Sequence, residues 1–171
     1  VCRQARRWSG SAPAGFRLSC NLSAPEILDG GFVERVIDTL DAHGLPGSVI
    51  RFEITEATAL RELDAVAERI AALREHGVEF SLDDFGTGYS SLTYLRRLPV
   101  SELKIDRSYV HRLLEDAHDR AIARAIVALG DAFGLRVVAE GVETAEQMDE
   151  ALRLLTLMPL PALKAHAIDL N

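Results

Sequence analysis

Five short apolar segments of this sequence end in polar or charged residues of the kind that bind metal ions or move protons. Those terminal groups are Asn21; Glu53 and Glu56; Asp83 and Asp84; Lys104 and Asp106; and Glu140 and Glu143. So many carboxylates at one edge of a sheet would repel one another unless cations lay among them. Oxygen ligands without histidine favour Mg²⁺ or Mn²⁺ over Zn²⁺. The pattern therefore predicts a site for divalent metal ions.

The centre of the predicted site is the adjacent pair Asp83 and Asp84. On a regular strand their side chains would point to opposite faces of the sheet, but Gly86 and Gly88 follow and would allow the backbone to bend. With such a bend one carboxylate could bridge two metal ions while the other binds only the second, as in two-metal phosphodiester hydrolysis. An aspartate pair that opens a tight turn is the alternative for this motif taken alone. The four other strand ends favour the metal site.

Lys104 lies in a Leu-Lys-Ile-Asp segment, where strand alternation places it with Asp106 on the face opposite to the two apolar residues. A buried lysine is costly unless it is paired, so we expect carboxylates around it. There it could orient an attacking water molecule, or it could only neutralise the acids, and the spacing does not choose between these roles. Glu140 follows the buried pattern Val137-Val138-Ala139, which favours a functional role over that of a solvated loop acid.

The elements that must position these groups alternate between short apolar runs and amphipathic helices. The runs cover residues 16–21, 49–54, 78–83, 102–105 and 135–139. Helical stripes lie between them, glycines at positions 44, 77 and 134 end three helices, and Thr144 with Gln147 predicts a capping box for the last helix. Short connections between such units require a parallel sheet. Because polar groups end every strand, we predict an α/β fold, an incomplete TIM-type (β/α) barrel of about five βα units, rather than an open sheet.

The composition describes one globular domain, with 48% hydrophobic residues in a chain of 171. The net charge of -7 argues against a nucleic acid polymer or an anionic membrane as partner, so a phosphate ligand would need metal ions or local dipoles. No apolar run reaches the length of a membrane span. Cys2 and Cys20, without a signal-peptide pattern, predict free thiols and a cytoplasmic location, with the chain alone or as part of a larger protein.

Five motifs occur in a specific order: Asn21-Leu22-Ser23, Glu53-Ile54-Thr55-Glu56, Asp83 to Leu92, Leu103 to Ser108, and Val138 to Thr144. Together, over about residues 3–148, they resemble the bacterial EAL-domain family of cyclic di-GMP phosphodiesterases. The resemblance implies a TIM-type barrel that hydrolyses one phosphodiester bond of cyclic di-GMP to linear pGpG with Mg²⁺ or Mn²⁺. It also implies that Asn21, Glu53 and Asp83 bind a first metal ion, and that Asp83 and Asp84 bind a second.

Further roles follow from the same resemblance. Glu140 would bind the second metal ion or assist the attacking water, and Lys104 would orient that water. Glu56 would anchor the loop of residues 85–91. Two more acids, Asp106 and Glu143, would support the site.

The chain departs from the family pattern at both ends. The family begins with a strand that carries the Glu-Ala-Leu motif, whose glutamate is a metal ligand, and this sequence has no such motif. Residues 149–171 also diverge: a Gln-Gly-Tyr-like segment is lacking, as if its strand had been skipped. We therefore predict a single truncated EAL-type domain over residues 1–171, with a two-metal site that lacks one ligand. We also expect little or no turnover by this chain alone, and a dimer or additional domains that cover the open edges of the sheet.

Two functions follow from these observations. The first is a metal-dependent cyclic di-GMP phosphodiesterase, supported by the intact internal acids and Lys104. The alternative is a catalytically silent EAL-type module that binds cyclic di-GMP or a protein partner as a sensor or scaffold. Two other motifs are weaker: His118-Asp119 lacks the ligand set of a His-Asp phosphodiesterase, and Arg3, Arg6 and Arg7 predict a solvated helix face rather than a membrane-binding one.

Overall fold

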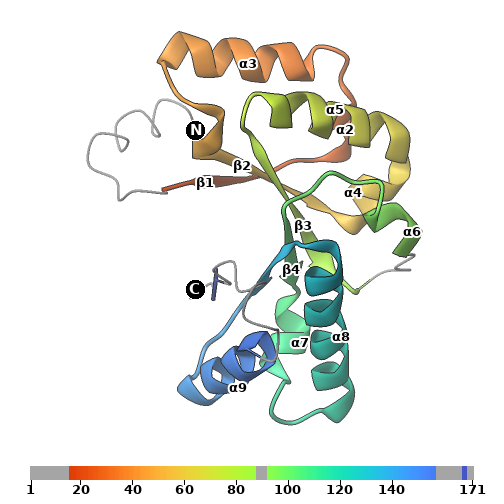
Figure 1. Ribbon diagram of the computed structural model, residues 1–171, viewed down its shortest axis with the longest axis vertical. Helices are drawn as coiled ribbons and strands as arrows, with labels where there is room; N and C mark the ends of the chain where they lie inside the picture. The colour runs from red at the N-terminus through yellow and green to blue at the C-terminus, as the bar shows by residue number, and fades with distance from the viewer. Residues whose placement is uncertain (1–15, 88–91, 157–166, 169–171) are drawn as a thin grey trace. The chain divides into compact units, whose positions relative to one another are not determined.

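The computed structural model describes residues 16–87, 92–156 and 167–168. These residues form two compact units, which are described separately. Unit 1 contains the described residues up to Ser81 together with Thr93–Val100, and unit 2 contains the rest. Strand β3 (Glu79–Phe85), labelled in Figure 1, begins in unit 1 and ends in unit 2.

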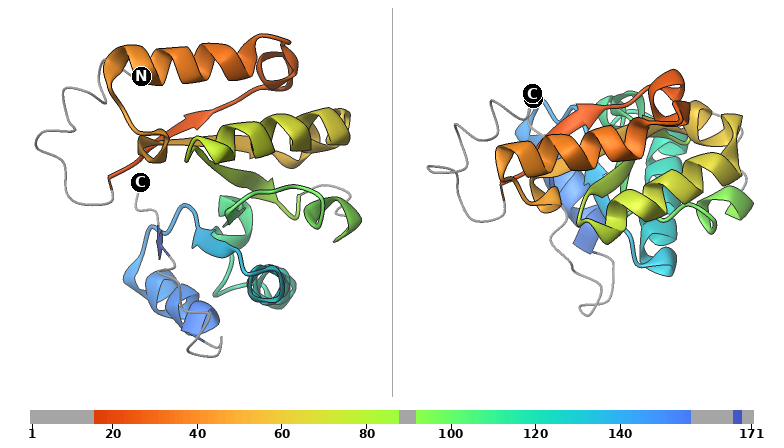
Figure 2. Two further views of the ribbon diagram at one scale, coloured as in Figure 1. Left: turned by 45° about the horizontal axis from the view of Figure 1, so that its top comes forward. Right: turned by 90° about the horizontal axis from the view of Figure 1, so that it is seen from above.

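Unit 1 is an α/β arrangement built on two parallel strands and the first part of β3. Its elements are β1 (Leu18–Asn21), α2 (Ala24–Leu28), α3 (Phe32–His43), a 3₁₀ turn (Gly47–Val49), β2 (Ile50–Thr55), α4 (Glu56–Arg61), α5 (Leu63–Glu75) and most of α6 (Leu92–Leu95). Strands β1 and β2 pair in register from Leu18 and Ile50 to Asn21 and Glu53. Helices α3 and α5 contact each other and can be followed in Figure 2. Gly44 ends α3 with a φ of 62°, as its position after the apolar stripe predicts.

Aromatic rings join the helices of unit 1 to its strands. The ring of Phe52 lies 5.7 Å from that of Phe32 and 5.6 Å from that of Phe80, measured between centroids. Side chains from α5, including Ile70 and Leu73, are fully buried in the same core. This core holds β2 in place, and with it the Glu53 side chain at its carboxyl end.

Gly47 allows two segments of unit 1 to approach closely. A Cβ atom on Gly47 would lie 2.1 Å from the backbone oxygen of His76. We expect Gly47→Ala to lower the free energy of unfolding by roughly 1–3 kcal/mol, because the backbone must shift to admit the methyl group. Urea denaturation will measure the loss. The control is Gly30→Ala, since nothing lies within 4 Å of its added Cβ; equal losses from both variants would contradict the prediction.

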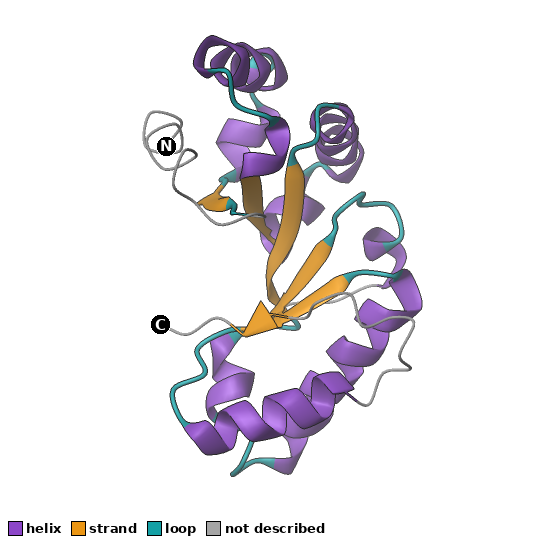
Figure 3. Ribbon diagram, turned by 60° about the vertical axis from the view of Figure 1, so that its left-hand side comes forward, coloured by secondary structure: helices purple, strands orange, loops and turns teal. Residues whose placement is uncertain are grey.

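Unit 2 contains the end of β3, two parallel strands and their helices. Its other elements are β4 (Glu102–Ile105), α7 (Arg107–His111), α8 (Ala117–Phe133), β5 (Arg136–Ala139), α9 (Ala145–Thr156) and β6 (Ala167–Ile168). Strand β5 pairs in parallel with β4 on one edge and with β6 on the other. Helix α8 contacts both β4 and β5, and Figure 3 shows the helices and strands of the unit by colour. The predicted capping box is confirmed, because the Gln147 N–H donates to Thr144 Oγ1 at 3.2 Å.

The structure adds one short strand that we did not predict. Ala167–Ile168, in the divergent carboxyl-terminal region, pairs with Val138 and Ala139 of β5. The outer edge of β5 carries backbone N–H and C=O groups that a later segment can satisfy. Two residues are too few to produce an alternating pattern, so the sequence gives no signal for this strand.

Charges at the amino ends of the strands are paired within each unit. In unit 1, Glu79 accepts from Arg51 at 2.7 Å and pairs with Arg17 at 2.8 Å. In unit 2, Glu102 is only 2% exposed and pairs with Arg136 at 2.5 Å. These ion pairs offset the charges of Glu79 and Glu102 at the amino ends of the strands. Among the helices of the described residues, none is long and apolar enough to cross a bilayer.

Candidate metal centre

In unit 1, two predicted metal ligands are cross-strand neighbours. Asn21 and Glu53 are register partners at the carboxyl ends of β1 and β2, and the Leu22 N–H donates to the Glu53 carbonyl at 2.8 Å. Asn21 is exposed and Glu53 is half-buried. Glu56, the predicted loop anchor, is the first residue of α4 and is buried. The structure therefore brings Asn21 and Glu53 together, while the anchoring role of Glu56 stays a prediction.

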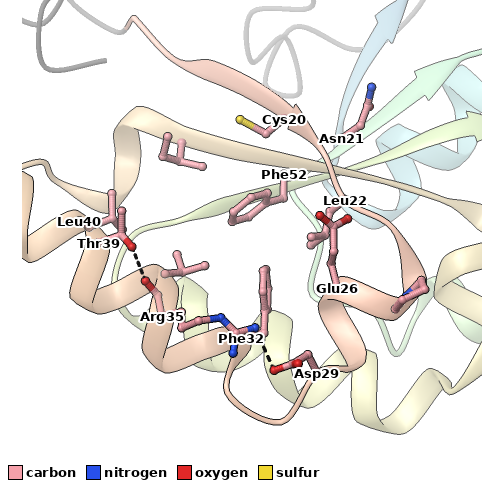
Figure 4. Close-up of a pocket in the computed structure, with 13 residues that line it drawn as sticks. Cys20, Asn21, Leu22, Glu26, Asp29, Phe32, Arg35, Thr39, Leu40 and Phe52 are labelled. Atoms are coloured by element: carbon pink, nitrogen blue, oxygen red, sulfur yellow. Dashed lines mark hydrogen bonds and ion pairs between the residues drawn. The ribbon is translucent and has the colours of Figure 1, made fainter. Parts of the chain in front are cut away.

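A cavity of about 630 Å³ lies in the same unit, between the strands and α3. Its apolar wall includes Phe32, Leu40 and Phe52. Cys20 and the predicted ligand Asn21 both line this cavity, and Figure 4 shows their side chains leaving β1 in different directions. Cys20 is a free thiol, as predicted, whereas Cys2 lies outside the described residues.

In unit 2, the backbone bends at the aspartate pair. Asp84 has a φ of 53° and is the one non-glycine residue with positive φ in the described part of the chain. Its N–H donates to Asp83 Oδ1 at 3.0 Å, and its carbonyl accepts from the Thr87 hydroxyl at 2.9 Å. Gly86 follows with a φ of 97°. The predicted bend is thus present, but it begins at Asp84 itself; Gly88 lies outside the described residues.

Lys104 connects the ends of three strands. It is only 5% exposed, and its Nζ lies 3.3 Å from Asp83 Oδ1 and forms an ion pair with Glu140 Oε1. Asp83 comes from β3, Lys104 from β4, and Glu140 directly follows β5. The expectation that carboxylates surround a buried lysine is confirmed. These contacts assemble one acid, one cation and a second acid at the same edge of unit 2.

The carboxyl groups of Asp84 and Asp106 contact each other. Partial burial raises the pKa of Asp84, and the charge of Asp83 and the contact with Asp106 raise it further, against the effect of Lys104. Burial would also raise the pKa of Asp106, but hydrogen bonds from the Ser108 hydroxyl and N–H hold it below its usual value. One proton shared by such a pair reduces the repulsion. A divalent cation would remove that repulsion altogether.

Glu143, the other predicted supporting acid, lies at the surface. Its carboxylate is 3.5 Å from His111 Nδ1, and its N–H donates to the Gln147 side chain at 2.8 Å. Together with Arg107 and Arg112 it lines a cavity of about 510 Å³ in unit 2. The structure thus places Glu143 beside this cavity, and its role in the site stays a prediction.

The donor set at these strand ends fits a hard divalent cation. All four predicted ligands offer oxygen atoms, the donors preferred by Mg²⁺ and Mn²⁺, and the pKa of Asp84 is raised by burial first and then by the negative charge of Asp83. Two of the ligands belong to unit 1 and two to unit 2. In the described residues, no three carboxylate, imidazole or thiolate side chains form a cluster that could hold a metal ion. The ligand assignment therefore stays a prediction.

Three contributors to this region were not predicted from the sequence. They are Ser108, which donates to Asp106; Tyr109, which contacts Gly86; and Gln147, which donates to the His111 carbonyl. Ser108 had a recognisable signal, because a serine two residues after an aspartate is typical of a helix cap. The sequence holds no recognisable signal for the hydrogen bond of Tyr109 to Gly86 or for that of Gln147 to His111.

Residues 1–156 match the family model described as EAL domain. The chain belongs to the EAL domain family. This membership confirms the resemblance found in the five motifs, and the TIM-barrel-like α/β fold that we predicted is confirmed by solved EAL structures. The match also covers all the predicted site residues.

Relatives of this EAL domain include larger signalling proteins. The chain is 48% identical over 154 residues to the bifunctional diguanylate cyclase/cyclic di-GMP phosphodiesterase MucR of Pseudomonas aeruginosa. The aligned region covers 90% of this chain and 22% of MucR. The chain thus spans about a fifth of the length of this curated relative. The predicted dimer or additional domains stay a prediction.

Solved EAL structures are similar over most of the chain. The MucR phosphodiesterase in complex with c-di-GMP matches with a TM-score of 0.85 and 48% identity, over 90% of this chain and 62% of that one. The EAL domain of Mycobacterium smegmatis DcpA matches with a TM-score of 0.83 and 40% identity, over 90% of this chain and 69% of the DcpA chain. The complex of Klebsiella pneumoniae BlrP1 with manganese and cyclic di-GMP matches with a TM-score of 0.79 and 28% identity. The match covers 90% of this chain and 39% of the BlrP1 chain.

Proposed function

We propose that this EAL domain carries the site of a metal-dependent phosphodiesterase that hydrolyses cyclic di-GMP to linear pGpG. The observation that carries the proposal is the contact of Lys104 with Asp83 and Glu140 at the carboxyl ends of neighbouring strands. The complexes of MucR with c-di-GMP and of BlrP1 with manganese and cyclic di-GMP support both the ligand and a divalent metal.

Each residue has a distinct task in this proposal. Asn21, Glu53, Asp83 and Asp84 would hold Mg²⁺ or Mn²⁺, which supplies positive charge to the phosphate and lowers the pKa of water. The Lys104 ammonium keeps the Asp83 and Glu140 carboxylates in place and directs the attacking water. Glu140 accepts the proton of that water as its oxygen bonds to phosphorus. The bond from phosphorus to the 3′ oxygen breaks, and that oxygen takes a proton to leave linear pGpG.

Release of pGpG from cyclic di-GMP tests this proposal directly. With one metal ligand of the family pattern lacking, we expect the chain to form pGpG only slowly, to need Mn²⁺ or Mg²⁺ for it, and to stop when a chelator removes the metal, because the repelling carboxylates then lose their counter-charge. Product would be separated and quantified by liquid chromatography. Formation of pGpG that is insensitive to chelation would contradict the metal-dependent mechanism.

One observation favours a second candidate, a module that binds cyclic di-GMP without hydrolysing it. Lys104 pairs with both Asp83 and Glu140 in the absence of metal, so these three side chains are held together without a divalent cation. Calorimetric titration with cyclic di-GMP, with and without Mn²⁺, separates the candidates. Binding that requires Mn²⁺ supports the enzyme, metal-independent binding supports the module, and an absence of binding contradicts both.

A further inference from the structure

The backbone at Asp84 needs external support. A positive φ is unfavourable for a residue with a side chain, and it persists only where surrounding contacts hold it. Within the turn, the hydroxyl and the N–H of Thr87 both donate to the Asp84 carbonyl. Further support comes from α7, a helix distant in sequence.

Helix α7 contacts the turn on both sides of the Asp84 backbone. Its capping residue Asp106 meets the Asp84 carboxyl group. One turn later, the Tyr109 hydroxyl donates a hydrogen bond of 2.6 Å to the Gly86 carbonyl, in a partly buried setting. The Tyr109 ring also lies 3.4 Å from the position that a Cβ on Gly86 would occupy. The helix therefore holds the side chain of Asp84 and the backbone two residues beyond it.

This helix is itself fixed at both ends. At its amino end the Asp106 carboxylate accepts from the Ser108 N–H at 2.9 Å. At its carboxyl end the His111 carbonyl accepts from the buried Gln147 side chain at 3.2 Å. Ile126 of α8 packs against Gly86 from the neighbouring side, 3.2 Å from the same Cβ position. Because α7 is held at both ends, the Tyr109 hydroxyl can fix the turn at Asp84 and Gly86. A hydroxyl on a loosely held helix could not.

We propose that Tyr109 is a positioning residue that fixes the direction of the Asp84 carboxylate through its hydrogen bond to Gly86. The proposal rests on the proposed function, because it takes Asp84 as a metal ligand. The aromatic ring fills the space beside Gly86, and the hydroxyl supplies the donor for the Gly86 carbonyl. Loss of the hydroxyl alone leaves the packing of the ring intact but no longer holds the turn. Metal binding must then order the Asp84 side chain, which lowers the affinity for metal.

The test is Tyr109→Phe, with Tyr94→Phe on α6 of unit 1 as the matched control. Calorimetric titration of the full chain with Mn²⁺ is expected to show about tenfold weaker binding for Tyr109→Phe, the usual effect of losing a supporting contact behind a metal ligand. Tyr94→Phe is expected to bind as the wild type does. Circular dichroism would show that both variants are folded. Equal affinity of Tyr109→Phe and the wild type would overturn the proposal.

A second measurement works without metal. The Thr87 N–H donates to the Asp84 carbonyl at 3.3 Å, so its hydrogen exchange reports on the turn. We expect faster exchange at Thr87 in Tyr109→Phe and no change in Tyr94→Phe. If the wild type fails to bind Mn²⁺, the proposed metal centre is wrong, and the exchange rate still decides whether Tyr109 holds the turn. Unchanged exchange would show that it does not.

Discussion

Lys104→Met is expected to lower the free energy of unfolding by roughly 3–5 kcal/mol in the absence of divalent cations, the usual cost of breaking a buried ion pair from one side. The side chain of Lys104 is 7% exposed, and those of its partners Asp83 and Glu140 are 16% and 20% exposed. Removal of the ammonium would leave two poorly solvated carboxylates facing the same space. Urea denaturation, followed by circular dichroism, measures the loss.

Two controls separate this effect from a general loss of positive charge. Arg124→Met changes an exposed cation of α8 and should alter stability by less than about 0.5 kcal/mol. The double variant Lys104→Met/Glu140→Gln should lose less stability than the two single changes added together, because the second change removes one of the stranded charges. Added Mn²⁺ should restore part of the loss. Strict additivity in the double variant would contradict the pairing.

The strands and long helices were predictable because their signals are local. The run at 102–105 coincides with β4, and Gly44 and Gly134 end α3 and α8 in the left-handed conformation that only glycine adopts easily. The short helices α2, α4 and α7 were not predicted. Five or six residues contain too little of the helical period to distinguish a helix from a turn. They depend on caps and on contacts that form only in the folded chain.

The candidate site was predictable in composition but not in geometry. Strand alternation correctly placed Lys104 among acids, since each β-strand directs alternate side chains to one face. It could not show that Asp84 itself adopts positive φ, next to the contacts that Tyr109 of α7 and its N-cap Asp106 make with this turn. In the sequence, Tyr109 looks like an ordinary aromatic residue beside a strand. Contacts across 23 positions of the chain leave no pattern in a single sequence.

The two ends of the strands in unit 2 differ in how their charges are balanced. At the amino ends, Glu102 and Arg136 form a pair without any excess carboxylate. At the carboxyl ends, one ammonium, that of Lys104, faces Asp83 and Glu140, and Asp84 and Asp106 contact each other nearby. A protein gains no stability from such an excess, because like charges repel. This arrangement suits a ligand that brings positive charge, as the proposed metal ions would.

Glu140→Gln is expected to reduce pGpG formation by roughly 10²–10⁴-fold, the range for loss of a general base. The substitution keeps the size of the side chain and one oxygen that can accept from Lys104, but the amide cannot take up a proton. The Glu140 N–H donates to the Ile105 carbonyl at 3.3 Å, so the backbone position does not depend on the carboxylate. Stability should therefore fall much less than in Lys104→Met.

The matched control is Glu146→Gln, which removes an exposed acid from the start of α9 six positions along the chain. It makes the same change in net charge, so an effect of overall charge would appear equally in both variants. Turnover is measured by chromatography of pGpG with Mn²⁺ present, and affinity for cyclic di-GMP by calorimetry. If Glu140→Gln loses turnover but keeps its affinity for cyclic di-GMP, and Glu146→Gln loses neither, then Glu140 takes up the proton of the attacking water and is not needed for binding cyclic di-GMP. Retained turnover would remove Glu140 from the chemistry and leave it as a partner that holds Lys104 in place.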